Sequence, residues 1–225
     1  MEKITNKEII DVVKFSDDKL VFVQKNPLSD SMQSKIDYYI INFAKGEKEV
    51  VTKKAYLLKK FGAAYEKITE KISDYIQCRA MILSDKTVFV VFPNGQAGLF
   101  DSNGELLWIK ELTYNDKPVC SLAEDEDSFW CVCRDENCVM KYNAENFAVD
   151  IRIGSKDAST FSQPHFVSAD ENYVYVCCNG NKVRKIDKST LIVSDVEESY
   201  PDLERYYKFK GYSIICCADG LYFDE

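Results

Sequence analysis

His165 is the only histidine of the chain, and its side chain is the one best suited to acid–base or metal chemistry near neutral pH. It follows Pro164 at the predicted start of a strand. A zinc site needs further ligands, and Cys131, Cys133 and Cys138 alternate across a strand and a turn instead of converging on the histidine. No feature of the sequence places a thiol beside the imidazole. We therefore predict no metal, no cofactor and no catalytic residue.

Carboxylates at the starts of strands are the next candidates, because glycoside hydrolysis uses a pair of acids. Asp11 is the only acid at the start of such a strand, although Asp116 and Glu204 lie just before two others. This pattern does not predict an acid–base pair. Asp11, His165 and Lys208 remain candidates for a ligand site in a central channel, with a small molecule or a carbohydrate as the ligand.

Two clusters of charge lie elsewhere in the chain. The acidic run 124–127 offers oxygen ligands for a hard cation, but it lacks the spacing of a calcium loop, and we predict a solvated turn. Lys53, Lys54, Lys59 and Lys60 form a basic cluster, which we predict to be a solvated strand and helix edge. An acidic peptide remains open as a partner for these lysines.

The elements that position these residues form a repeat. In the stretch 81–112, four apolar runs are separated by the polar turns 84–87, 93–95 and 101–104. This pattern is typical of the four-stranded antiparallel meander of a propeller blade. Acidic first turns and an apolar residue before Asp or Asn recur along the chain, as a repeat protein requires. We predict an all-β, five-bladed propeller in a single domain, 1–225, with blades at approximately 11–58, 78–113, 118–154, 164–197 and 205–225.

The last repeat has only three predicted strands, and apolar residues stand spare at the N-terminus. We expect residues 3–10 to supply the fourth strand and to close the ring, which removes exposed sheet edges. Two insertions belong to the first blade, 25–36 and 59–77. In the second, Ile68, Ile72, Tyr75 and Ile76 follow a helical spacing, and we expect a short helix that begins near Gly62. A sixth blade hidden in 50–77 remains an alternative.

One segment resembles a known family of repeats. Residues 99–108 read Leu-Phe-Asp-Ser-Asn-Gly-Glu-Leu-Leu-Trp, which resembles the repeat of quinoprotein-like propellers. Segments 172–176 and 183–187 are similar to the YVTN-type propeller repeat. The resemblance covers two blades closely and the others loosely. It implies the propeller fold and no particular activity, because such blades serve enzymes and scaffolds alike.

Composition limits the classes of partner. The 225-residue chain has a net charge of −8 and a pI near 4.9, which disfavours nucleic acid and anionic membranes as partners. The N-terminus lacks the apolar segment of a signal peptide, and most of the nine cysteines lie inside apolar runs. We therefore expect free, buried thiols, a cytoplasmic location and a monomer.

For function, the sequence favours a non-catalytic module that binds a protein or a peptide. The face that carries both insertions is the expected surface, with Met32, Tyr65 and Tyr75 as its exposed anchors. The alternative is a small-molecule or carbohydrate site, for binding or hydrolysis, in the central channel at Asp11, His165 and Lys208. These two functions differ in where the exposed apolar residues and the converging polar groups must lie.

Overall fold

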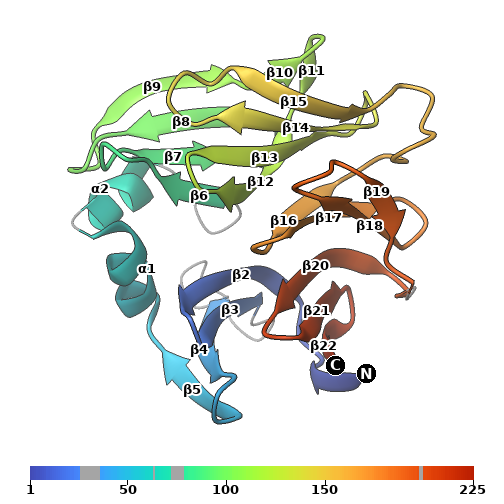
Figure 1. Ribbon diagram of the computed structural model, residues 1–225. Coiled ribbons are helices and arrows are strands. Elements are labelled where there is room, and N and C mark those ends of the chain that lie inside the picture. The colour runs from blue at the N-terminus through green and yellow to red at the C-terminus, as the bar shows by residue number, and fades with distance from the viewer. Residues whose placement is uncertain (26–35, 63, 72–78, 198–199) are drawn as a thin grey trace.

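The protein is a five-bladed β-propeller, in agreement with the predicted fold class. The computed structural model describes residues 1–25, 36–62, 64–71, 79–197 and 200–225. Five four-stranded antiparallel sheets surround a central channel, with both chain ends in the same blade (Figure 1). Apolar side chains lie on both faces of each sheet, and each face packs against a neighbouring blade. This packing arranges the five sheets in a ring.

The first two blades each run from an inner to an outer strand. The first blade consists of β2 (Ile9–Ser16), β3 (Lys19–Lys25), β4 (Ile36–Asn42) and β5 (Glu47–Val51). The second blade consists of β6 (Arg79–Ile82), β7 (Val88–Val91), β8 (Gln96–Phe100) and β9 (Leu106–Glu111). A small hairpin leads from the second blade into the third, with strands β10 (Thr113–Tyr114) and β11 (Lys117–Pro118).

The remaining blades follow the same order. The third blade consists of β12 (Cys120–Asp125), β13 (Ser128–Cys133), β14 (Cys138–Asn143) and β15 (Val149–Gly154). The fourth consists of β16 (Phe166–Ala169), β17 (Tyr173–Cys178), β18 (Lys182–Asp187) and β19 (Val193–Asp195). The fifth contains β20 (Leu203–Phe209), β21 (Tyr212–Cys217) and β22 (Gly220–Asp224).

The N-terminal strand closes the ring as predicted. β1 (Glu2–Thr5) pairs antiparallel with β22 and completes the fifth blade. It is shorter than the predicted range 3–10, because Ile9 and Ile10 already belong to β2 of the first blade. Ile9 is fully buried in the core that the first, fourth and fifth blades share. The two chain ends therefore hold each other through backbone hydrogen bonds.

Two helices separate the first and second blades, and here the predicted boundaries were wrong. Residues 53–58, assigned to the first blade, belong to α1 (Lys53–Phe61), whose first turn is capped by Thr52 Oγ1 at 3.2 Å from Ala55 N. Gly62 ends this helix with a φ of 57° instead of starting the next, α2 (Ala64–Lys71). Ile68 lies in a helix as predicted and is buried, whereas 72–77 lie outside the described residues. The described part of 50–77 is thus mainly helical after Val51, and no sixth four-stranded sheet occurs in the described ranges.

The apolar core lies between blades. One cluster joins both helices to the first and second blades through Tyr56, Leu57, Phe61 and Ile68. Seven cysteines are buried among apolar side chains, and no disulfide joins the cysteines of the described ranges. Neither described helix is long and apolar enough to cross a membrane.

Candidate functional site

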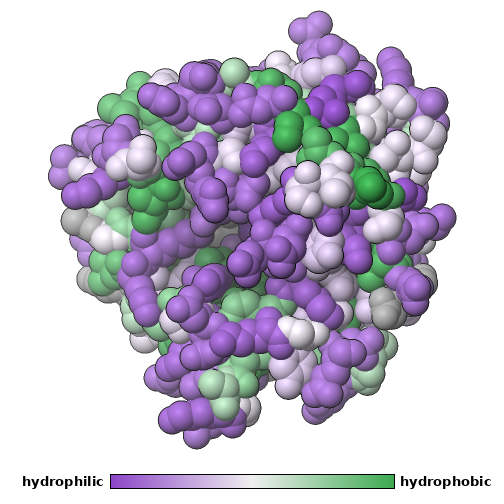
Figure 2. All heavy atoms as spheres, in the orientation of Figure 1, coloured by the Kyte–Doolittle hydropathy of each residue, from purple (hydrophilic) through white to green (hydrophobic). Residues whose placement is uncertain are grey.

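A cavity of about 1070 Å³ occupies the centre of the ring. The inner strand of every blade lines it (β2, β6, β12, β16 and β20), and α1 completes the wall. Lining residues from the first hairpin turns of four blades surround its opening, and Figure 2 shows this hollow ringed mainly by hydrophilic residues. Sequence reasoning pointed instead to the face that carries the connections between blades.

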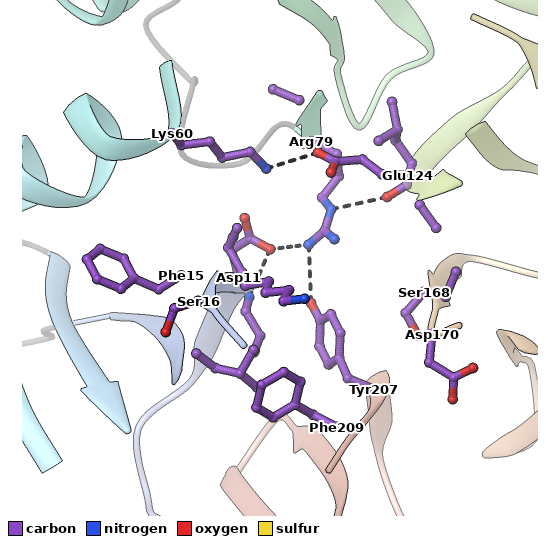
Figure 3. A pocket seen from close by; sticks show the side chains of 18 of the residues that line it. Asp11, Phe15, Ser16, Lys60, Arg79, Glu124, Ser168, Asp170, Tyr207 and Phe209 are labelled. Atoms are coloured by element: carbon purple, nitrogen blue, oxygen red, sulfur yellow. Dashed lines mark hydrogen bonds and ion pairs between the residues drawn. The ribbon is translucent and has the colours of Figure 1, made fainter. Parts of the chain in front are cut away.

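An ion pair between the first and second blades lies in the cavity. The Arg79 guanidinium contacts the Asp11 carboxylate, and their side chains are 22% and 13% exposed (Figure 3). Arg79 also donates to the Tyr207 hydroxyl at 3.3 Å and, through Nε, to the Leu122 carbonyl at 3.3 Å. Its guanidinium carbon lies 5.5 Å from the ring centroid of Phe166. Arg79, on the inner strand of the second blade, thus contacts the inner strands of the four other blades.

The surroundings keep Arg79 charged and the nearby phenols neutral. Burial disfavours the Arg79 cation, but the Asp11 carboxylate and Tyr207 outweigh that cost and raise the pKa of Arg79. Burial also raises the pKa of the Tyr207 and Tyr56 phenols. At neutral pH the cavity therefore presents a fixed cation and two neutral hydroxyls, which can all donate hydrogen bonds.

The predicted acidic turn is more than a solvated loop. Asp125 accepts hydrogen bonds from Lys188 Nζ at 2.5 Å, Lys141 Nζ at 2.8 Å and Trp130 Nε1 at 2.9 Å. Partial burial favours the neutral acid, but these donors outweigh it and lower the pKa of Asp125. Since Lys188 follows β18, this carboxylate ties the third blade to the fourth. No group of three or more metal-ligating side chains occurs in the described ranges.

Three lysines on α1 and β20 also line the cavity. Lys60 on α1 reaches Glu124 of the third blade at 3.2 Å. Lys59 lies over the Phe15 ring at 3.7 Å from its centroid, and Lys208 donates to Ser213 Oγ at 3.0 Å. The predicted basic cluster is thus partly a wall of the cavity, not only a solvated edge.

The structure brings together two of the three predicted channel residues. Asp11 and Lys208 both line the cavity, whereas His165 is not among the lining residues. The backbone N–H of His165 donates to the Cys177 carbonyl at 3.0 Å, and burial lowers the pKa of its imidazole. Of the predicted partner-binding anchors, Met32 and Tyr75 lie outside the described residues. Tyr65 belongs to α2, and the structure does not describe its side chain.

Arg79 and Tyr207 were missed as site residues. Both lie in inner strands. Arg79 is the first residue of β6, and Asp11 lies near the start of β2, the equivalent strand of the preceding blade. Opposite charges at matching positions of neighbouring repeats were the available signal. Tyr207 carried none, because it follows a second tyrosine in the same strand and the sequence does not tell the two apart.

Fold and site together define a five-bladed propeller with a central cavity large enough for a ligand. No protein-family model matches the sequence, and no curated protein matches it. Among solved structures, the chain is similar to streptogramin B lyase, also a propeller, with a TM-score of 0.51 and 11% identity over 95% of this chain. That alignment spans 63% of the lyase. At this identity the likeness supports the fold alone.

Two further solved structures align less well. The computationally designed Ika8 protein gives a TM-score of 0.49 at 11% identity, covering 95% of this chain and 57% of that one. Glutaminyl cyclase from Myxococcus xanthus gives 0.45 at 8% identity, covering 61% of this chain and 60% of that one.

Proposed function

We propose that the protein binds a small polar ligand in its central cavity. The observation that carries this proposal is the cavity itself, about 1070 Å³ in volume, with Asp11, Arg79 and Tyr207 held together in its wall. Ligand pockets in proteins span about 300–1,000 Å³ and combine apolar walls with a few fixed polar groups. The volume of this cavity lies just above that range.

The lining has the mixed character that such a pocket requires. Six aromatic residues contribute to it: Phe15, Tyr38, Tyr56, Phe61, Tyr207 and Phe209. Against them stand hydrogen-bond donors whose geometry is fixed by packing, chiefly Arg79 between Asp11 and Leu122. A preorganised donor costs little entropy to engage, which favours specific recognition over loose adhesion. The buried free thiols suit a reducing compartment, so the proposal places the protein in the cytoplasm.

A ligand screen on the full chain tests the proposal. We would measure thermal unfolding with amino acids, short peptides, sugars and dicarboxylic acids, and then measure the affinity of each hit by calorimetry. A ligand present at a hundredfold excess over its Kd stabilises the fold by about 2.7 kcal/mol. For a domain of this size, such a gain raises Tm by about 5–10 °C.

A pair of tryptophan variants locates the binding. Ser16 lines the cavity, so Ser16→Trp would fill space that the ligand needs (Figure 3). Ser102, in an exposed turn of the second blade, is not among the lining residues, so Ser102→Trp is the matched control. We expect the first variant to lose the ligand response and the second to keep it. Equal responses in both variants, or no response to any compound in the wild type, would contradict the proposal.

A further inference from the structure

The charges that line the cavity are balanced, although the whole chain is acidic. Seven basic and seven acidic residues line it, whereas the chain carries a net charge of −8. The two signs are separated in part. Asp11 and Asp17 lie on the mainly basic side and Lys188 on the mainly acidic side, which leaves lining charges of +3 and −4 on the two sides. The basic side is formed by α1 and the inner strands of the first and fifth blades, with Lys14, Lys59, Lys60, Lys208 and Lys210. The acidic side is formed by the third and fourth blades, with Glu124, Asp125, Glu126, Asp170 and Glu171.

These two sides face each other in the ring. The first blade lies across the channel from the third and fourth, so β2 faces β12 and β16 (Figure 1). β20 of the fifth blade faces β12 across the channel but lies beside β16 of the neighbouring fourth blade. A charge-separated cavity of this kind produces a field directed across it. That field favours a ligand whose own charges are separated in the opposite sense.

Several of the lining charges are already neutralised. Lys14 pairs with Asp17 at 2.9 Å, and Lys210 pairs with Asp18. As described above, the Lys60–Glu124 pair spans the two sides, and Asp125 has two lysine partners. These pairs account for the charges that serve the fold and leave a smaller set for a ligand.

The remaining charges are two cations and three anions. One of the anions, Asp170, already accepts hydrogen bonds from two backbone N–H groups and the Tyr175 hydroxyl, so it is satisfied without a ligand. Within the described ranges, Lys59 and Lys208 have no carboxylate within ion-pair distance, and Glu126 and Glu171 have no cation. Lys59, Glu126 and Glu171 are exposed to solvent at the opening, and Lys208 is half-buried. Each side of the cavity therefore keeps charges available for an incoming group of opposite sign.

We propose that the ligand is a zwitterion of the short-peptide class, with a free amino group and a free carboxylate. Its carboxylate would face Lys59 and Lys208, and its ammonium group would face Glu126 and Glu171. This inference rests on the proposed function and specifies its ligand. The cavity holds the equivalent of about 35 waters at about 30 Å³ each, enough for a peptide of a few residues that keeps its solvation shell.

The test compares one pool of random tripeptides in three forms: free at both ends, N-acetylated, and C-amidated. Affinities for the full chain would be measured by calorimetry, with Ser16→Trp to show that binding occurs in the cavity. We expect each cap to weaken binding by about tenfold, because each removes one charge-assisted hydrogen bond. Free tripeptide that binds wild type and Ser16→Trp equally would overturn the inference.

Paired variants then assign each end of the peptide. The double variant Glu126→Gln, Glu171→Gln should weaken the free peptide about tenfold and leave the N-acetylated peptide unchanged. Lys59→Met with Lys208→Met should show the mirror result, with the C-amidated peptide unchanged. Lys45→Met, at an exposed turn that does not line the cavity, is the control. All these positions are at least partly exposed, so the variants should fold, and their Tm checks this.

The outcomes separate this inference from the proposed function. If capped and free peptides bind equally well in the cavity, the zwitterion is wrong and cavity binding stands. If no peptide binds while a sugar or a dicarboxylic acid binds wild type but not Ser16→Trp, the same conclusion follows. If no compound binds in the cavity at all, both proposals fail.

Discussion

The Asp11–Arg79 pair offers a quantitative test of how the cavity is held together. The perturbation is a double-mutant cycle with Asp11→Asn, Arg79→Met and the two combined. Asp11→Asn keeps the shape of the side chain, but it leaves the Arg79 guanidinium without its counter-charge at 22% exposure. Arg79→Met leaves the Asp11 carboxylate with one backbone donor, Val12 N at 2.9 Å.

The magnitude follows from burial. Removing one partner of a fully buried ion pair costs about 3–5 kcal/mol, because the other charge stays desolvated. Asp11 and Arg79 retain 13% and 22% exposure toward the cavity, so water recovers part of that penalty. We expect each single variant to lower the free energy of unfolding by about 2–3 kcal/mol. The double variant should lose less than the sum of the two, with a coupling energy of about 2 kcal/mol.

The assay is equilibrium unfolding in urea, followed by both fluorescence and circular dichroism. For a domain of this size, a loss of about 2–3 kcal/mol corresponds to a Tm lower by about 4–12 °C. Single-variant effects that add in the double variant to within about 0.5 kcal/mol would refute the reasoning. Such additivity would mean that each side chain is stabilised by its other neighbours and not by its counterpart.

Two further predictions concern the closure of the ring and the single histidine. At Gly220, where φ is 142°, an added Cβ would lie 2.0 Å from the Thr5 carbonyl oxygen of β1. Gly220→Ala should therefore cost at least about 2 kcal/mol in urea unfolding, and Gly180→Ala, with positive φ but open space, about 1 kcal/mol. Equal losses would contradict the closure. Burial lowers the pKa of His165, so the unfolded chain binds the proton first as the pH falls below 6.5, the ordinary pKa of histidine. Stability should decline from there toward the lower folded-state pKa, and His165→Gln should flatten the curve just below pH 6.5; an unchanged slope would contradict it.

Most of the fold was predictable because its signals are local. Each blade carries its own turns and apolar runs, and Asp101 shows the mechanism: its carboxylate accepts from Asn103 N at 2.9 Å and Glu105 N at 2.8 Å. Such side-chain bonds shape a turn without help from distant residues. The closing strand was predictable as well, because an incomplete last repeat requires a partner.

The helix 53–61 was missed for a different reason. Val50 and Val51 favour a strand, and the expected fourth strand was extended through them into Tyr56 and Leu57. What decides the structure is the cap at Thr52 together with the burial of Tyr56, Leu57 and Phe61 between two blades. That burial depends on tertiary packing, and a repeat pattern carries no information about it.

The site was only half predictable for the same reason. Asp11 and Lys208 were chosen by their places in inner strands, and those places are set by the repeat. The pairing of Asp11 with Arg79, and the exclusion of His165 from the lining, depend on how neighbouring blades rotate against each other. Side chains at equivalent positions of two repeats lie at the same level along the channel axis, but they do not point in the same direction.

The helix pair changes how the first and second blades contact each other. Where α1 and α2 fill the space between the first and second blades, apolar contact between those blades passes through the helices (Figure 1). The inner strands on either side of this seam are joined by the Asp11–Arg79 pair, a polar contact that faces the cavity. A ligand that engages Arg79 therefore acts on the seam as well as on the pocket. Binding energy should appear as added stability of the first and second blades above all, measurable as slowed hydrogen exchange in β2 and β6.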